Sequence, residues 1–60
     1  MNNENMRIKF KQWHEANMKP NLKLIAERLN ITESYFVNWK NGKRNMSDEL
    51  LRRVDRLISK

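Results

Sequence analysis

Residues 22–42 read LKLIAERLNITESYFVNWKNG, and this stretch decides the fold. The apolar residues of its first part recur at i, i+3, i+4 and i+7, which is typical of a helix with one buried face. They are Leu22, Ile25, Ala26 and Leu29. Asn30 tolerates the left-handed backbone that ends a helix, and Thr32 can cap the next one. The stretch therefore predicts helices over residues 22–29 and 33–41, separated by a turn of about three residues.

The flanking sequences predict one further helix on each side. Asn2 or Asn3 can cap a helix over residues 4–17, and Ser47 can cap a helix over residues 47–58. Their inner faces would carry Met6, Phe10 and Trp13 in the first helix and Leu50, Leu51, Val54, Leu57 and Ile58 in the last. Met6, Met18 and Met46 are expected to fill gaps in the core. Residues 1–60 should thus form a single all-α domain.

Turn residues separate the predicted helices. Pro20 disfavours helix at Lys19, and Asn21 can cap the helix that follows. Gly42 is the only glycine, and it stands directly after a helix that ends at Asn41. A helix commonly ends with a residue of positive φ at this point, which glycine adopts most readily.

The composition excludes several classes of function. The chain has 60 residues, no cysteine and one histidine, so we expect no disulfide and no metal site. It has no glycine-rich phosphate loop, no paired carboxylates and no nucleophile beside His14, so we expect no enzyme, no cofactor and no small-molecule ligand. Its apolar runs are shorter than the roughly 18 residues of a membrane span, which favours a cytoplasmic protein.

The charge points to a polyanionic partner. Thirteen Lys and Arg against seven Asp and Glu give a net charge of +6. Clustered cations gain free energy by releasing counterions from phosphates, although such a charge can also serve only solubility. Trp13 and Trp39 could stack on single-stranded bases, but their helical spacing favours the core.

The window from Leu22 to Asn41 resembles the lambda-repressor/Cro-like (XRE) family of helix-turn-helix domains. The resemblance rests on small Ala26, on the core positions, and on the ending Trp39-Lys-Asn-Gly-Lys-Arg44. The core positions are Ile25, Leu29, Ile31, Phe36 and Trp39. It covers roughly residues 8–58 and implies a compact four-helix domain with a central helix-turn-helix.

Three features depart from the family pattern. Asn30 stands at a turn position where the family usually has glycine, which is a conservative change. Leu22 replaces the glutamine that often contacts the DNA backbone. The family usually has a fifth helix, and we expect it to be absent here or replaced by a partner subunit.

The resemblance implies that the helix over residues 33–41 enters the DNA major groove. Phe36 and Trp39 would face the core, leaving outward residues to contact bases. These are Thr32, Glu33, Ser34, Val37 and Asn38. Asn38 can pair with adenine and Glu33 can accept from cytosine. Thr32 can instead be only a cap, Glu33 only a first-turn acid, and Asn38 only part of a solvated face.

A second set of residues is expected to contact phosphates, which fixes position on DNA without reading sequence. It consists of Asn21, Lys23, Tyr35, Lys40, Asn41, Lys43 and Arg44. The pair Lys43 and Arg44 can also be only a solvated link, and the Tyr35 ring can pack against the preceding helix rather than reach a phosphate.

The resemblance further implies a small transcriptional regulator that binds double-stranded DNA. We expect a repressor that acts by occupying a pseudo-palindromic operator as a homodimer. Leu51, Leu57 and Ile58 are the candidate dimer residues, because they exceed what so small a core is expected to cover. The alternative is a basic interaction module, such as an antitoxin-like or inhibitor protein, that binds an acidic protein. RNA binding is less favoured because the A-form major groove excludes a helix.

Overall fold

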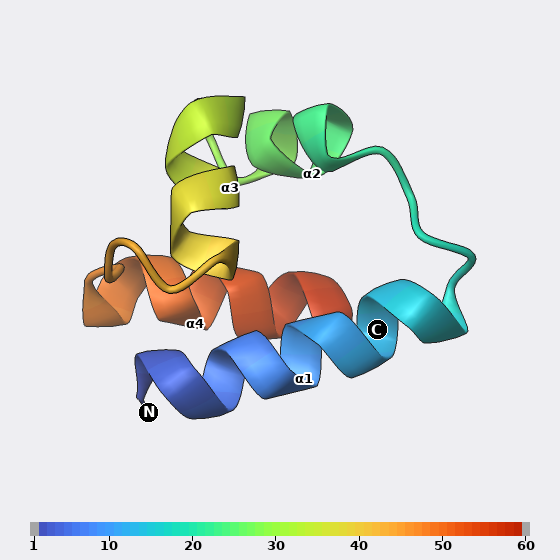
Figure 1. The fold of residues 1–60 in the computed structure, drawn as a ribbon, viewed down its shortest axis with the longest axis horizontal. Coiled ribbons are helices and arrows are strands. Elements are labelled where there is room, and N and C mark those ends of the chain that lie inside the picture. The colour runs from blue at the N-terminus through green and yellow to red at the C-terminus, as the bar shows by residue number, and fades with distance from the viewer. Residues whose placement is uncertain (1, 60) are drawn as a thin grey trace.

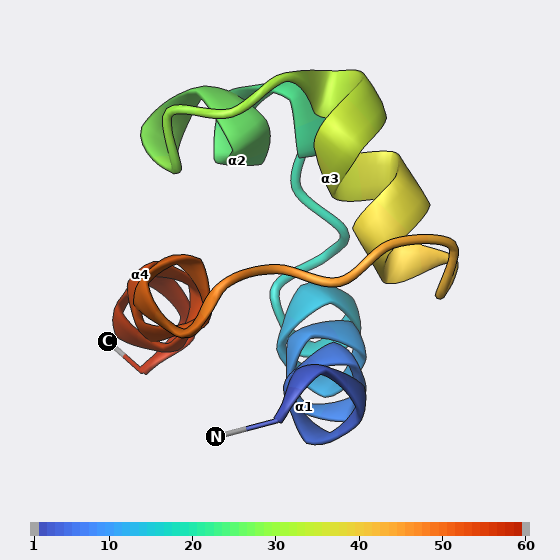
Figure 2. The ribbon, with the colours of Figure 1, turned by 90° about the vertical axis from the view of Figure 1, so that its left-hand side faces the viewer.

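Four helices in two layers make up the computed structural model, which describes residues 2–59. The helices are α1 (Asn3–Ala16), α2 (Leu22–Arg28), α3 (Glu33–Lys40) and α4 (Asp48–Ile58). α1 and α4 lie side by side and run in the same direction, and α2 and α3 pack together above them (Figures 1 and 2). The described residues contain no strand, so the predicted all-α class is confirmed.

Each helix begins at a side-chain cap. Asn2 Oδ1 accepts from the backbone N–H of Asn5 at 2.8 Å, and Asn21 Oδ1 accepts from that of Lys23 at 2.8 Å. Thr32 and Ser47 cap α3 and α4 in the same way, with hydroxyl acceptors at 3.1 and 3.3 Å from the backbone N–H groups of Tyr35 and Leu50. Such caps satisfy N–H groups that the first turn leaves without a partner. The predicted caps at these positions are confirmed.

The first three helices all end in the same left-handed turn. Asn30 has φ 62° and Gly42 has φ 81°, as the sequence predicts, and Met18 adopts φ 66° after α1. Around Asn30, its N–H donates to the Glu27 carbonyl at 3.0 Å, and the Ile31 N–H donates to the Ala26 carbonyl at 3.0 Å. This is the Schellman pattern, which returns the chain toward the core. α2 and α3 are therefore joined by a short, hydrogen-bonded turn.

Aromatic rings form the centre of the core. Phe10, Phe36 and Trp39 are fully buried, and the Phe10 and Phe36 rings meet edge to face at 5.0 Å between centroids. Trp39 lies 5.7 Å from Phe36 and 6.2 Å from Phe10. The rest of the core comes from α1, α2 with its C-cap, α4 and the α3–α4 link: Met6, Ile25, Ala26, Leu29, Met46, Leu51, Val54 and Ile58. Trp13 is half-buried against this core, so neither tryptophan is a free stacking surface.

Two predicted burial patterns are wrong. Met18 is 92% exposed rather than a core filler, because it occupies the left-handed turn after α1. Leu51 is 0% exposed and Ile58 only 9%, so the chain's own core covers both. Their side chains are unavailable to a second subunit, and of the proposed dimer residues only Leu57 stays half-buried. The cause is that α4 packs along α1, which buries the inner face of α4.

Asn3 joins three parts of the chain that are distant in sequence. Its Oδ1 accepts from Trp39 Nε1 at 2.9 Å and from the backbone N–H of Met46 at 2.7 Å. Its Nδ2 donates to the Met46 carbonyl at 3.3 Å. The first turn of α1 therefore supplies the hydrogen-bond partner of the buried indole and holds the end of the α3–α4 link, just before α4 begins.

An ion pair connects the two helices of the lower layer. Lys9 Nζ lies 2.9 Å from Asp55 Oδ1, so it bridges α1 and α4. The hydrogen bond from Lys9 lowers the pKa of the Asp55 carboxyl; partial burial opposes this, and the charge of Lys9 and a hydrogen bond from Ser59 add to it. Because the Lys9 side chain is largely exposed and the Asp55 side chain only partly buried, the pair contributes little to stability. No helix within residues 2–59 has both the length and the apolar character of a membrane span.

We expect Met18→Gly to stabilise the protein by about 0.5–1 kcal/mol, because glycine adopts positive φ without the steric cost that a Cβ atom adds. The exposed methionine side chain contributes no core contact that would be lost. Urea denaturation measures the difference. Met18→Ala is the matched control, since it removes the side chain and keeps the Cβ atom. Equal stabilities of the two variants would contradict the prediction.

We expect Asn3→Ala to lower the free energy of unfolding by about 1–3 kcal/mol, because it leaves the Trp39 indole N–H and the Met46 N–H without an acceptor. Asn3→Asp keeps an acceptor oxygen at the same place and should retain most of the stability. Denaturant melts followed by tryptophan fluorescence make the comparison. If the aspartate variant loses as much stability as the alanine variant, the side-chain oxygen of Asn3 does not stabilise the fold as an acceptor for Trp39 and Met46.

Candidate nucleic-acid interface

The orientation of α3 is set by its two buried rings. Phe36 and Trp39 both face the core, so the opposite side of the helix faces away from it. Thr32, Glu33 and Ser34 are exposed at the start of this side. Val37 and Asn38, the next residues expected to contact bases, are half-buried. The structure therefore gives α3 an accessible polar face that begins at its N-terminus.

The N-terminal end of α3 combines a cap with accessible polar groups. Thr32 Oγ1 accepts from the Tyr35 N–H, which bears out the cap role. A hydroxyl also carries one donor hydrogen, so Thr32 can still donate to a ligand. Glu33 is the acidic residue of the first turn, where it complements the helix dipole, and its exposed carboxylate can also accept from a ligand.

Arg44 stacks on Tyr35 behind the end of α3. The guanidinium carbon lies 3.9 Å from the centre of the Tyr35 ring, close enough for a cation–π contact. The Tyr35 hydroxyl donates to the Asn45 carbonyl at 3.5 Å. Tyr35 is thus half-buried, its hydroxyl and ring both contact the α3–α4 link, and the exposed Arg44 lies over the ring.

Arg7 of α1 shapes the segment that carries Arg44. Its Nε donates to the Trp39 carbonyl at 2.5 Å, and its Nη2 donates to the Arg44 carbonyl at 2.7 Å and to Asn45 Oδ1 at 3.0 Å. A cation at the C-terminal carbonyls of α3 also complements the helix dipole. Sequence reasoning missed this positioning role. The available signal was the i, i+4 spacing of Asn3 and Arg7, which places both on one helix face.

A hollow of about 510 Å³ lies where α1 meets the end of α3. It is lined by Glu4, Arg7, Ile8, Lys11, Lys40, Asn41 and Gly42. Lys11 was not among the predicted site residues, and the structure places it beside the same hollow as Lys40. Ile8 is 53% exposed here. This hollow extends the basic surface at the end of α3 onto α1.

Apart from Tyr35, which contacts Arg44 and Asn45, the predicted phosphate-contacting residues fall into two groups. Lys40, Asn41, Lys43 and Arg44 lie at and just beyond the end of α3, where all but Lys40 are exposed. Asn21 and Lys23 lie separately at the exposed start of α2. The two ion pairs within residues 2–59 join Lys9 to Asp55 and Arg53 to Glu49, so neither uses a cation of this set. Their charges are available to an anion.

The described residues hold no group of three His, Cys, Asp or Glu side chains placed to bind a metal ion. His14 stacks on Phe10 at 5.3 Å, and its Nε2 lies 2.8 Å from the Pro20 carbonyl oxygen, so it has a structural role at the end of α1.

Comparison with known proteins gives no family assignment. No protein-family model matches the chain, and neither the curated proteins nor the solved structures include a significant match to it. The basis for a functional assignment is therefore the geometry of α2, α3 and the residues around them.

Proposed function

We propose that this chain is a sequence-specific, double-stranded DNA-binding transcriptional regulator of the helix-turn-helix type. One observation carries the proposal: α3 follows α2 after a tight turn at Asn30 and presents a polar face, with unpaired cations beyond its C-terminus. A helix of this kind fits the major groove, where its first residues reach base edges. The same features support a lambda-repressor-like arrangement and kinship with the family that the sequence resembles.

The reading residues in this proposal are Thr32, Glu33, Ser34, Val37 and Asn38. The Asn38 side chain can donate and accept at adenine N6 and N7, and Glu33 can accept from cytosine N4. A good bidentate contact is worth about 1–3 kcal/mol of discrimination between bases. Val37 can contact the thymine methyl group, which is an apolar contact in the major groove.

The cations beyond α3 hold the domain on the phosphate backbone. Arg44 is held on the Tyr35 ring and Arg7 binds the carbonyl of Arg44, so the guanidinium is ordered before DNA binds. Such preorganisation lowers the entropy lost on binding. Lys40, Lys43 and, from α1, Lys11 would add charge around the same segment.

We further propose that the protein acts in the cytoplasm as a repressor, by occupying an operator and excluding competitors. Two copies on a pseudo-palindrome would place half-sites about 34 Å apart. Direct contacts between the copies cannot come from the buried Leu51 and Ile58. Of the three candidate dimer residues, only the half-buried Leu57 would be available for such a contact.

Selection of bound duplexes from a randomised library at roughly physiological salt is the first test. Enrichment of one sequence would support a specific reader, and a pseudo-palindrome would support two copies on DNA. A single unrepeated motif would restrict the proposal to a monomer. No enrichment would overturn sequence-specific binding and favour the alternative of a protein-interaction module.

Variants of the two residue sets should then behave differently on the selected duplex. We expect Glu33→Ala and Asn38→Ala to change base preference by about 1–3 kcal/mol per lost contact. Lys43→Ala and Arg44→Ala should weaken binding to all sequences and lower the salt slope by about one each. Arg52→Ala is the control, because Arg52 is exposed on α4 and does not line the hollow beside α3. Unchanged preference and unchanged slope would contradict the assignment of both sets.

A further inference from the structure

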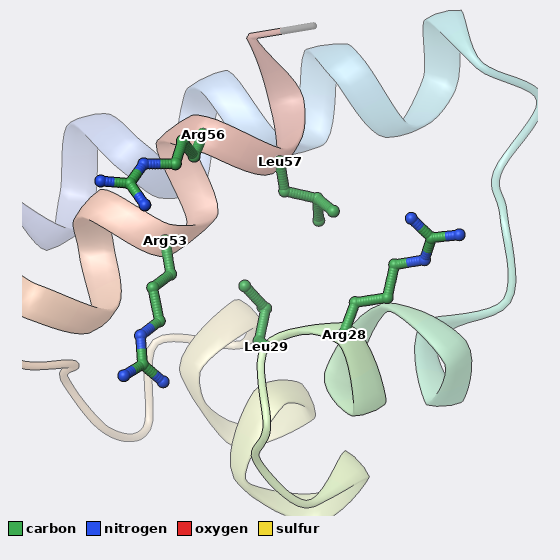
Figure 3. Close-up of a pocket in the computed structure, with 5 residues that line it drawn as sticks. All are labelled: Arg28, Leu29, Arg53, Arg56 and Leu57. Carbon is green, nitrogen blue, oxygen red and sulfur yellow. The ribbon is translucent and has the colours of Figure 1, made fainter.

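A second surface lies between α2 and α4, outside α3. The hollow there has a volume of about 360 Å³. Figure 3 shows Leu29 and Leu57 pointing toward each other across it, with Arg28 extending from α2 and Arg53 and Arg56 from α4. The stems of the arginines and the two leucines make its walls largely apolar. Its rim carries three guanidinium groups. Apolar walls within a cationic rim are unlike the polar face of α3.

The hollow continues along α2. A second hollow of about 340 Å³ shares Arg28 and Leu57 with the first. Its other lining residues are Trp13, Pro20, Asn21, Leu24 and Ile25. Leu24 is 58% exposed, and Trp13 and Leu57 are half-buried. Together these residues form an elongated groove, which we call the α2–α4 groove. An elongated, open groove suits a stretch of polypeptide better than a small molecule.

The charges of the groove are all positive. None of the residues that line either hollow is acidic. Arg53 pairs with Glu49 at 3.3 Å, and this pair is solvent-exposed and therefore weak. Arg28 and Arg56 take part in neither ion pair of the described chain. Each lies in the last turn of its helix, where a cation is favourable. The helix ends account for the position of these two arginines, but not for the exposed Leu24 and the half-buried Leu57 that line the same groove.

We propose that the α2–α4 groove binds an acidic, amphipathic segment of a partner protein. Apolar side chains of that segment would cover Leu24 and Leu57, and its carboxylates would pair with Arg28 and Arg56. Arginine matches carboxylates through paired, parallel hydrogen bonds. This inference does not rest on DNA binding, since the groove takes no residue from α3 and shares only Asn21 with the residues expected to contact phosphates.

Two other occupants fit the groove less well. A second copy of this chain would bring its own arginines on α4 against Arg53 and Arg56, which repel. A DNA backbone would satisfy the guanidinium groups but leave the leucines uncovered, because phosphates and sugars offer little apolar surface. An acidic amphipathic segment would complement both the positive charge of the groove and its apolar walls.

The probe is a capped peptide of about 16 residues with leucines at i, i+3, i+4 and i+7 and glutamates around them, long enough to form a helix. Titration of the ¹⁵N-labelled protein should shift the backbone amides of Arg28, Leu29, Arg56 and Leu57 more than those of α3. A peptide with every glutamate replaced by glutamine should bind at least tenfold more weakly. No saturable shift with the acidic peptide, or shifts centred on α3, would overturn the proposal.

Charge reversal provides a matched pair of variants on one helix. Arg56→Glu should weaken binding of the acidic peptide about tenfold or more, which is about 1.4 kcal/mol. Arg52→Glu makes the same change of charge at an exposed position that lines neither hollow, and should weaken binding less than threefold. Circular dichroism melts check that both variants fold.

If the two charge reversals weaken peptide binding equally, the peptide is held by general charge attraction. That result would overturn the proposal that the groove is its binding site. DNA binding is measured in parallel on the same variants. Loss of DNA affinity with Arg56→Glu but not Arg52→Glu would assign the groove to the phosphate backbone and overturn the protein partner. A chain that binds the peptide but selects no DNA sequence would retain this inference while the proposed DNA function fails.

Discussion

The rest of the structure depends on the packing and the hydrogen bond of the buried Trp39 indole. Its ring packs against Phe10 of α1 and Phe36 of α3, and its N–H donates to Asn3 across most of the chain. The same Asn3 oxygen accepts from Met46, so one side chain fixes the end of α3 and the link to α4 together. A buried indole N–H without an acceptor would cost about 1–3 kcal/mol, which is a large share of the stability of so small a domain.

The parts of the fold that follow local rules could be predicted from the sequence. Caps at Asn21, Thr32 and Ser47 and left-handed turns at Asn30 and Gly42 depend on residues within one turn of the chain, where preferences are strong. The left-handed turn at Met18 could not, because methionine has no preference for positive φ, although backbone hydrogen bonds from Met18 and Lys19 to the Glu15 and His14 carbonyls close the turn. The bonds of Asn3 and Arg7 span more than 30 residues, so the i, i+4 spacing of the two residues places them on one helix face without identifying their partners.

The candidate site shows the same division. The outward residues of α3 follow from the burial of Phe36 and Trp39, and helical spacing alone is enough to predict those. The contribution of α1 to the basic surface depends on which face of α1 meets α3, which the sequence does not specify. The assignment of Leu51 and Ile58 to a dimer surface failed for a related reason: helical spacing shows that a face is apolar but not which neighbour covers it.

An exposed apolar residue indicates a binding surface only when its neighbours are also apolar, because single exposed apolar residues are normal on proteins. Met18 is exposed by the turn that it occupies, and Ile8 borders the basic hollow between α1 and α3. Leu24 differs, since it joins the half-buried Leu57 in a groove rimmed by arginines from two helices. Leu51, Val54 and Ile58 of α4 are buried in the core, so they are not accessible to a partner. A partner that approaches α4 from the side of α2 would therefore contact this groove. Such a partner would need apolar side chains to cover Leu24 and Leu57, and carboxylates to pair with the arginines, which is the chemistry of an acidic, amphipathic segment.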